Sequence, residues 1–425
     1  MQRATSKSNT LEITSKIPST TAISVLALGS ALPVIARGNA TVLDIVSILM
    51  APITLPIAFK NTFLKRVIIS ALLMNLVQSI SDLAHRTQLI SMPGLLGLQI
   101  SLLVSIMYWF YDSKKIPWRI IVVSVSIGMI ALQFLGHWVN SSNIWKYNLN
   151  FAICTAAFSL ALSKNSLSGI QLCFGFLAIV LSLIFDFRAA LFASALYLIT
   201  SLYLILTQKK GAIPRKSINN QKPLVLVILA IGILVIIFSY PKLAADGVLG
   251  TRASEQQIAL NSEGLGSYYL LNARPELPYI LILSSRSPWL GYGSYGTPTG
   301  TDVYSSLEKL NRVLPLSDVN LRNWLLASNP KTSGYNVHTR LGATAFSGGL
   351  FTLIFWLYYL GTTFRIALQS LILKRKETAL LTFLLFWAFW DTLFSPLTVT
   401  ARFEIAISLF VNAVVQKKIT QSCDD

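Results

Sequence analysis

The sequence predicts an all-α polytopic membrane protein with about twelve transmembrane helices. Of the 425 residues, 53% are hydrophobic and only 12% are charged, and the mean hydropathy is +0.60. Soluble proteins carry about 25% charged residues, so this composition excludes a soluble enzyme, a disordered protein and a disulfide-rich scaffold. The apolar residues are also grouped into runs of roughly 17–25 residues, the length that a helix needs to cross the hydrocarbon core.

The apolar runs divide the chain into five parts. A cytoplasmic tail (1–20) precedes helices 1–9 (21–240), which are followed by a large loop (241–340), helices 10–12 (341–416) and a second cytoplasmic tail (417–425). We expect the spans near residues 21–36, 40–59, 67–84, 88–111, 119–137, 149–163, 168–187, 189–207, 223–240, 341–364, 378–396 and 401–416.

The excess of basic residues is distributed as a membrane topology requires. The chain has 35 Lys and Arg against 17 Asp and Glu, a net charge of +18, and a soluble protein with this charge would be a candidate for nucleic-acid binding. Here most basic residues fall in alternate loops and in both tails, and basic residues accumulate on the cytoplasmic side of membrane proteins. We therefore expect both termini to be cytoplasmic, the loop 241–340 to face the other side, and no nucleic-acid partner.

The loop 241–340 has an ordinary polar composition and contains two predicted helices. The segment RPELPYILILSSR begins with a proline suited to a first helical turn. The segment YSSLEKLNRVL places Tyr304, Leu307, Leu310 and Leu314 on one helix face. Both segments are expected to be amphipathic helices that lie over the membrane domain.

The ionisable residues within the predicted spans gather toward their outer ends. Because such residues are costly in a membrane, they suggest function by default, and a transporter would place them near the bilayer midplane. Their position favours chemistry at the outer surface, although a span-end arginine can also snorkel to the interface and pair with a nearby carboxylate. The residues concerned are Asp44, Asp82, Asp186, Arg188, Asp391, Arg402 and Glu404, with His85, His137 and His338 on the same side.

Common cofactor motifs are missing from the sequence. It contains no HExxH motif, no Cys/His cluster, no Walker loop and no GxSxG motif. Its three cysteines are too scattered for a metal cluster or a disulfide framework. The glycine-rich stretch SPWLGYGSYGTPTG follows no predicted strand, so we interpret it as a loop with several turns and expect neither a metal nor a cofactor.

Four features in a fixed order resemble a known family. Arg188 opens a span in FDFRAALFASALYLI, and Arg274 begins a predicted helix in the large loop. The stretch SPWLGYG follows about a dozen residues later, and His338 ends the loop in YNVHTRLGATAFSGGLFTLIFWLYYL. Over roughly residues 150–400 this pattern resembles the O-antigen ligase and O-antigen polymerase superfamily, which has about twelve spans and a GT-C-like architecture.

The resemblance implies a glycosyltransferase of the bacterial inner membrane with its active site facing the periplasm. Members of the family transfer a glycan en bloc from undecaprenyl pyrophosphate to an acceptor hydroxyl, without a metal and, in the simplest mechanism, with inversion. The chain departs from the family pattern at three positions. Thr339 follows the histidine where Asn is usual, Phe187 stands where a small hydroxyl residue often precedes the first arginine, and Pro278 replaces an aromatic residue.

The resemblance also implies roles for individual residues. Arg188 and Arg274 would bind the pyrophosphate, since a guanidinium binds phosphate oxygens in a bidentate manner. His338 would be the general base, because the pKa of a histidine, about 6.5, suits proton transfer near neutral pH. Arg340 and Asp186 are possible accessory residues.

The sequence leaves alternatives open for the acceptor and for the class of function. An O-antigen ligase attaches the glycan to lipid A–core, whereas a repeat-unit polymerase of the same superfamily attaches it to another glycan. A glycan-lipid flippase or another transporter is the alternative from a different class. Trp289 and Tyr292 are candidates to line a sugar site, although aromatic residues are enriched at membrane interfaces anyway.

Overall fold

The structure is a computed structural model that describes most of the chain, and its regular secondary structure is helical. Within the described ranges an isolated bridge between Pro33 and Thr41 is the single β-type pairing. The predicted all-α class is confirmed for this part of the chain. The described residues are 19–34, 40–87, 92–135, 149–162, 169–185, 187–208, 241–247, 251–264, 276–294, 296–313, 339–398 and 400–424.

Six segments of the described chain are long and apolar enough to cross a membrane. They lie in α2 (Val42–Lys60), α3 (Thr62–Ala84), α4 (Met92–Asp112), α5 (Trp118–Leu135), α8 (Arg188–Gln208) and α16 (Leu353–Ile372, with the segment starting at Leu350). Shorter apolar helices occupy four more predicted spans: α1 (Ser19–Ala31), α6 (Asn150–Ala161), α7 (Gly169–Ile184) and α17 (Thr378–Phe394). The predicted span at 223–240 lies outside the described residues.

The outer surfaces of these helices are apolar, as lipid contact requires. Large side chains such as Leu49 on α2, Leu83 on α3, Leu206 on α8 and Leu357 on α16 are exposed. A soluble monomer rarely exposes so much apolar surface. Helix length, composition and surface together indicate a membrane protein.

The last helix, α18 (Ala401–Asp424), lies in the interior of the bundle. It packs against α3, α4, α5, α16 and α17, and every residue from Ala401 to Val415 except Glu404 is buried. Glu404, Ser408, Asn412 and Gln416 form a polar stripe at four-residue spacing, and Asn412 Nδ2 donates to Thr363 Oγ1 of α16 at 3.0 Å. The predicted span at 401–416 is therefore a helix, but its polar stripe keeps it out of the six apolar segments.

The predicted continuous span at 341–364 is wrong, because the chain breaks there at a pair of glycines. A short helix, α15 (Arg340–Gly348), ends before Gly349, and a 3₁₀ turn (Leu350–Thr352) leads into α16. Gly349 has φ of 78°, in the left-handed region, so the helix cannot continue through it. The interruption creates a separate helix in which every residue except Ala343 is buried.

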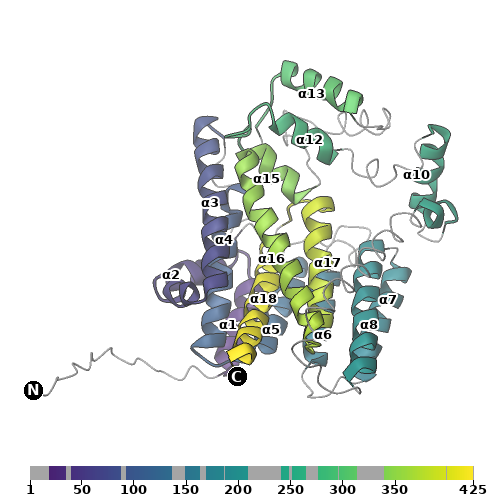
Figure 1. Cartoon of the computed structure of the whole chain (residues 1–425). Helices are drawn as coiled ribbons and strands as arrows, with labels where there is room; N and C mark the ends of the chain where they lie inside the picture. The colour runs from purple at the N-terminus through teal and green to yellow at the C-terminus, as the bar shows by residue number, and fades with distance from the viewer. Residues whose placement is uncertain are drawn as a thin grey trace, which may run out of the picture.

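The described parts of the large loop contain α10 (Thr251–Ser262), α12 (Glu276–Ser284) and α13 (Gly300–Val313). Figure 1 shows α12 and α13 above α15, at the end of the bundle away from the C-terminus. Leu310 of α13 is buried in a small core with Tyr279 and Leu283 of α12 and Phe346 of α15. Both predicted helices are thus confirmed, but only α13 is amphipathic, because no described side chain of α12 is exposed; Tyr304 of α13 is 73% exposed and does not share the buried face.

Candidate functional site

The structure describes only part of the predicted site. His338, Arg274 and Asp186 lie outside the described residues, and Arg188 is described only as the first residue of α8, without its side chain. Arg340 is the one residue of the predicted set whose side chain is described. The geometry around Arg340 is therefore the starting point.

Arg340, the first residue of α15, is buried between two carboxylates from the last two helices. Its side chain is 4% exposed, and its Nη2 lies 3.0 Å from Asp391 Oδ2 of α17. The same nitrogen donates to Glu404 Oε2 of α18. A buried guanidinium requires such partners, because an unpaired charge in an apolar interior costs several kcal/mol.

Hydroxyl groups hold the two carboxylates and the start of α15 in place. Ser395 Oγ donates to Asp391 Oδ1 at 2.7 Å, and Thr400 Oγ1 donates to Glu404 Oε1 at 2.9 Å. Thr339 caps α15, since its Oγ1 accepts from Gly342 N at 2.9 Å. The backbone that directly follows His338 in the sequence is thus fixed by a helix cap and a buried ion pair.

A second buried pair begins two residues before Glu404 on α18. Arg402 Nη2 lies 3.1 Å from Asp44 Oδ2, and both side chains are almost completely buried. Asp44 also accepts from the backbone N and the Oγ1 of Thr41 at 2.7 and 2.9 Å, which caps α2. This pair fastens the start of α2 to the start of α18.

We call Asp44, Arg340, Asp391, Arg402 and Glu404 the carboxylate–arginine cluster. The cluster holds three carboxylates and two guanidinium groups, so it has one carboxylate in excess when all are ionised. The pairing of span-end arginines with nearby carboxylates, one of the two interpretations of the sequence, is confirmed for these residues. An excess buried carboxylate favours a cation nearby.

The start of α8 lies beside the helix that carries Asp391. Phe187, immediately before Arg188, is buried with its ring centroid 5.7 Å from that of Trp387 on α17. Trp387 precedes Asp391 by one helical turn, about 6 Å along the axis. The segment that leads into α8 therefore contacts α17 one helical turn before Asp391, the residue that pairs with Arg340.

Two buried polar groups on the neighbouring helices α6 and α17 have no hydrogen-bond partner among the described residues. They are the side-chain amide of Asn150, at the start of α6, and Trp387 Nε1. Their helices touch here, because Phe151 packs edge-on against Trp387 with ring centroids 5.9 Å apart. The sequence analysis missed Asn150, and its only sequence signal is a polar residue at the start of an apolar run.

The glycine-rich stretch docks the large loop onto α15. We call residues 287–294 the glycine latch. The latch contacts the chain on both sides of the break between α15 and α16. Ser81 of α3 joins the two, because its Oγ donates to Leu290 O of the latch and to Ser347 O of α15. Three backbone bonds complete the contact: Tyr292 N to Phe346 O at 2.8 Å, Gly293 N to Ser347 O at 2.9 Å, and Leu350 N to Pro288 O at 2.8 Å.

Two glycines of the latch are required by its geometry. Gly291 and Gly293 have φ of 62° and 77°, and a Cβ at Gly291 would clash with the carbonyl oxygen of Phe346. With Gly296 they have the spacing of a dinucleotide-binding motif, but the segment follows α12 instead of a strand. The glycines serve close packing of protein against protein.

Asp82 fastens the latch to α3. It is completely buried and accepts hydrogen bonds from Ser294 N, from Ser294 Oγ at 2.9 Å and from Thr87 Oγ1 at 2.8 Å. Asp82 therefore neutralises no arginine among the described residues but stabilises the docked loop.

The two aromatic candidates for a sugar site have different environments. Tyr292 is buried and stacks on Phe346 with ring centroids 5.3 Å apart, so it belongs to the core of the loop. Trp289 is 67% exposed and packs against Phe351. Of the two, Trp289 is the one open to a ligand.

The described residues contain no group of three or more His, Cys, Asp and Glu side chains placed to hold a metal ion. Comparisons of the chain with protein-family models, with curated proteins and with solved structures find no match.

We predict that Arg340→Ala destabilises the protein by about 3–5 kcal/mol, because it leaves Asp391 and Glu404 buried without their cation. Thermal unfolding of the purified protein in detergent measures the loss. Arg312→Ala is the control: its pair with Glu308 is on the surface, with the side chains 74% and 53% exposed, and its removal should cost less than about 1 kcal/mol. Equal losses in both variants would show that the cluster contributes no more than a surface ion pair.

We also predict that Gly291→Ala releases the latch, because the new methyl group clashes with α15 and the backbone is left-handed. Limited proteolysis should then cut within 241–340 several times faster than in the wild type. Gly300→Ala serves as the matched control in the same loop, since a Cβ there meets no atom within 4 Å. Unchanged cleavage of Gly291→Ala would contradict the docking role.

Proposed function

We propose that the chain is a membrane glycosyltransferase of the O-antigen ligase type. It would transfer a glycan en bloc from undecaprenyl pyrophosphate to an acceptor hydroxyl at the periplasmic face of a bacterial inner membrane, with about twelve spans in the complete topology. The observation that carries the proposal is the anchoring of Arg340. The ion pairs of Arg340 fix the backbone that directly follows His338 against α17 and α18. The same part of α17 contacts Phe187, the residue before Arg188.

In this proposal His338 is the general base, and the structure around the next two residues supports the role. Thr339 occupies the position where the family that this chain resembles usually has Asn, and Thr and Asn are both favoured helix caps. The cap bond to Gly342 N is retained here at 2.9 Å. The carboxylates that pair with Arg340 would stabilise the imidazolium that forms when His338 takes a proton.

Arg340 is assigned a positioning role. Its Nη2 already contacts two carboxylates, so its charge is more than neutralised and little of it is left for a phosphate. The pyrophosphate-binding role stays with Arg188 and Arg274, and Asp186 remains a possible accessory residue. Asn150 and Trp387, with their unsatisfied polar groups beside the start of α8, are added as candidates to contact the glycan.

The proposed reaction is a single displacement. The acceptor hydroxyl gives its proton to His338 and attacks the anomeric carbon from the face opposite the pyrophosphate. The bond between that carbon and the phosphate oxygen breaks, and undecaprenyl pyrophosphate leaves with the bonding electrons. The anomeric configuration is inverted, and the negative charge of the leaving group is stabilised by the two arginines.

The acceptor separates two forms of the proposal. Transfer to lipid A–core makes the protein a ligase, and transfer to another repeat unit makes it a polymerase with the same chemistry. The exposed side chain of Trp289 on the latch is available to either acceptor.

We predict that His338→Ala abolishes glycan transfer, since removal of a general base lowers the rate by about 10²–10⁴-fold. The assay displays surface polysaccharide by size on a gel, in a host that lacks this protein and is complemented with each variant. Loss of attached long chains indicates a ligase, and single repeat units on the core indicate a polymerase.

His85→Ala is the control for this assay. His85 is the exposed C-cap of α3, and within the described part of the chain its Nδ1 hydrogen-bonds to the backbone oxygen of Ser81. Full restoration of the glycan by His338→Ala, with the variant present in the membrane, would refute the general-base role and leave transport of the lipid-linked glycan as the better explanation.

A further inference from the structure

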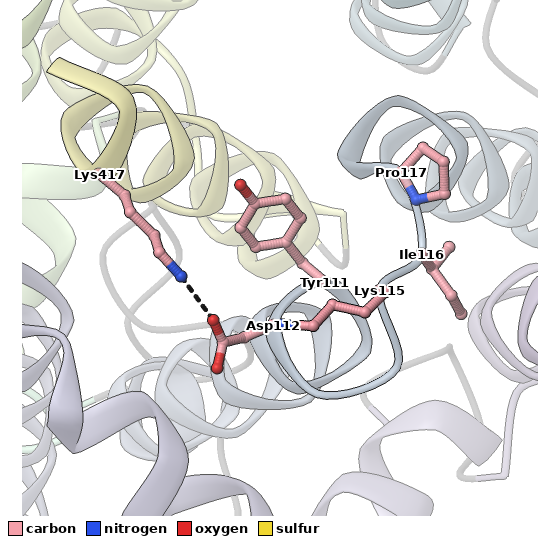
Figure 2. A pocket seen from close by; sticks show the side chains of 6 residues that line it. All are labelled: Tyr111, Asp112, Lys115, Ile116, Pro117 and Lys417. Atoms are coloured by element: carbon pink, nitrogen blue, oxygen red, sulfur yellow. Dashed lines mark hydrogen bonds and ion pairs between the residues drawn. The ribbon is translucent and has the colours of Figure 1, made fainter. Parts of the chain in front are cut away.

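A cavity lies at the end of the bundle opposite the carboxylate–arginine cluster. Fifteen residues of α18 separate Arg402 from Lys417, a rise of about 22 Å. The cavity has a volume of about 190 Å³ and lies between Lys417 and the turn that joins α4 to α5. Figure 2 shows the residues that line it: Tyr111, Asp112, Lys115, Ile116, Pro117 and Lys417.

The lining carries a net positive charge. Lys417 Nζ lies 2.6 Å from Asp112 Oδ1, and this hydrogen bond raises the pKa of Lys417 above its ordinary value, so the lysine stays charged. Lys115 is exposed and has no ion pair among the described residues. Lys418, which follows Lys417, lies over the ring of Trp118, 5.7 Å from its centroid.

Lys115 holds a backbone conformation that glycine would adopt more easily. Its φ is 56°, in the left-handed region that favours glycine, and a bond from Ile116 N to Phe110 O at 3.1 Å closes the turn. A lysine here strains the backbone and places a cation at the cavity. Its removal therefore need not damage the fold.

The cavity lies at the ends of two helices that are long enough to cross a membrane. Two apolar segments long enough to cross a membrane meet at this turn, one ending at Asp112 and the next starting at Trp118. Tyr111 is partly exposed at this turn, whereas Trp109 and Trp118 are buried beside it. Basic pockets between transmembrane helices bind the phosphates of anionic lipids.

We propose that this cavity binds the phosphate of an anionic phospholipid head group, with Lys115 as the principal cation and the Lys417–Asp112 pair as the opposite wall. The volume is several times that of one water molecule, about 30 Å³, so a phosphate and part of its glycerol can enter. The proposal is independent of the proposed function and holds for either orientation of the chain in the membrane.

Native mass spectrometry of the purified full-length protein tests the proposal, with dioctanoyl phosphatidylglycerol, dioctanoyl phosphatidylcholine and inorganic phosphate as separate probes. The wild type should bind phosphatidylglycerol more tightly than phosphatidylcholine. Lys115→Gly should weaken phosphatidylglycerol binding about fivefold, the equivalent of roughly 1 kcal/mol per basic residue at a membrane surface. Its thermal transition should not fall.

Lys374→Gly is the matched control, because Lys374 also has a left-handed backbone, with φ of 49°, but does not line the cavity. It should bind the lipid like the wild type. Unchanged lipid binding by Lys115→Gly, an equal loss in Lys374→Gly, or equal binding of phosphatidylcholine would each overturn the proposal. Displacement of the lipid by an equal concentration of inorganic phosphate would overturn the assignment to a lipid.

Discussion

The burial of the Arg340 guanidinium is the constraint on which the rest of this end of the bundle depends. A charge in an apolar interior has to be matched within hydrogen-bond distance, and here the matching groups come from two other helices, through Asp391 and Glu404. Separation of α15 from α17 or α18 would leave at least one uncompensated buried charge. The second pair, between Arg402 and Asp44, extends the same requirement to α2.

This constraint reaches the large loop through α15. The helix has nine residues, and its first residue enters the cluster while the carbonyls of Phe346 and Ser347 near its end bind the latch. Because a helix of this length is stiff, the latch contacts are held about 10 Å along the helix axis from the residue that enters the cluster. Asp82 and Ser81 then fix the latch to α3. The loop is thus held by the same short helix that follows His338 in the chain.

The amino-acid sequence was sufficient to predict the all-α class and the positions of most described helices, because runs of apolar residues report directly on helix length. It did not predict the break at Gly349, since two glycines inside an apolar run look the same in a continuous helix and in a turn. It also did not predict that α18 would be surrounded by protein, because its polar stripe faces partners, such as Thr363, that only the packing supplies.

The candidate site was predictable to a smaller extent. The gathering of charged residues at one end of the spans was visible in the sequence, but their pairing was not, since Asp44 and Arg402 come from opposite ends of the chain. The glycines of the latch were interpreted as turns, and only the structure shows that Gly291 packs against Phe346. Asn150 was missed because a polar residue at a helix start resembles an ordinary cap.

The central proposal is that His338 and Arg188 act together at one site beside the carboxylate–arginine cluster. Its most direct test is cross-linking by a short, rigid bis-maleimide of a variant with cysteines at positions 188 and 338, in a background without Cys154, Cys173 and Cys423. The account predicts an intramolecular cross-link for this pair. It predicts none for a pair at positions 188 and 115, because position 115 lies at the other end of the bundle. Absence of the 188–338 cross-link, when both cysteines react with a mono-maleimide, would contradict the account.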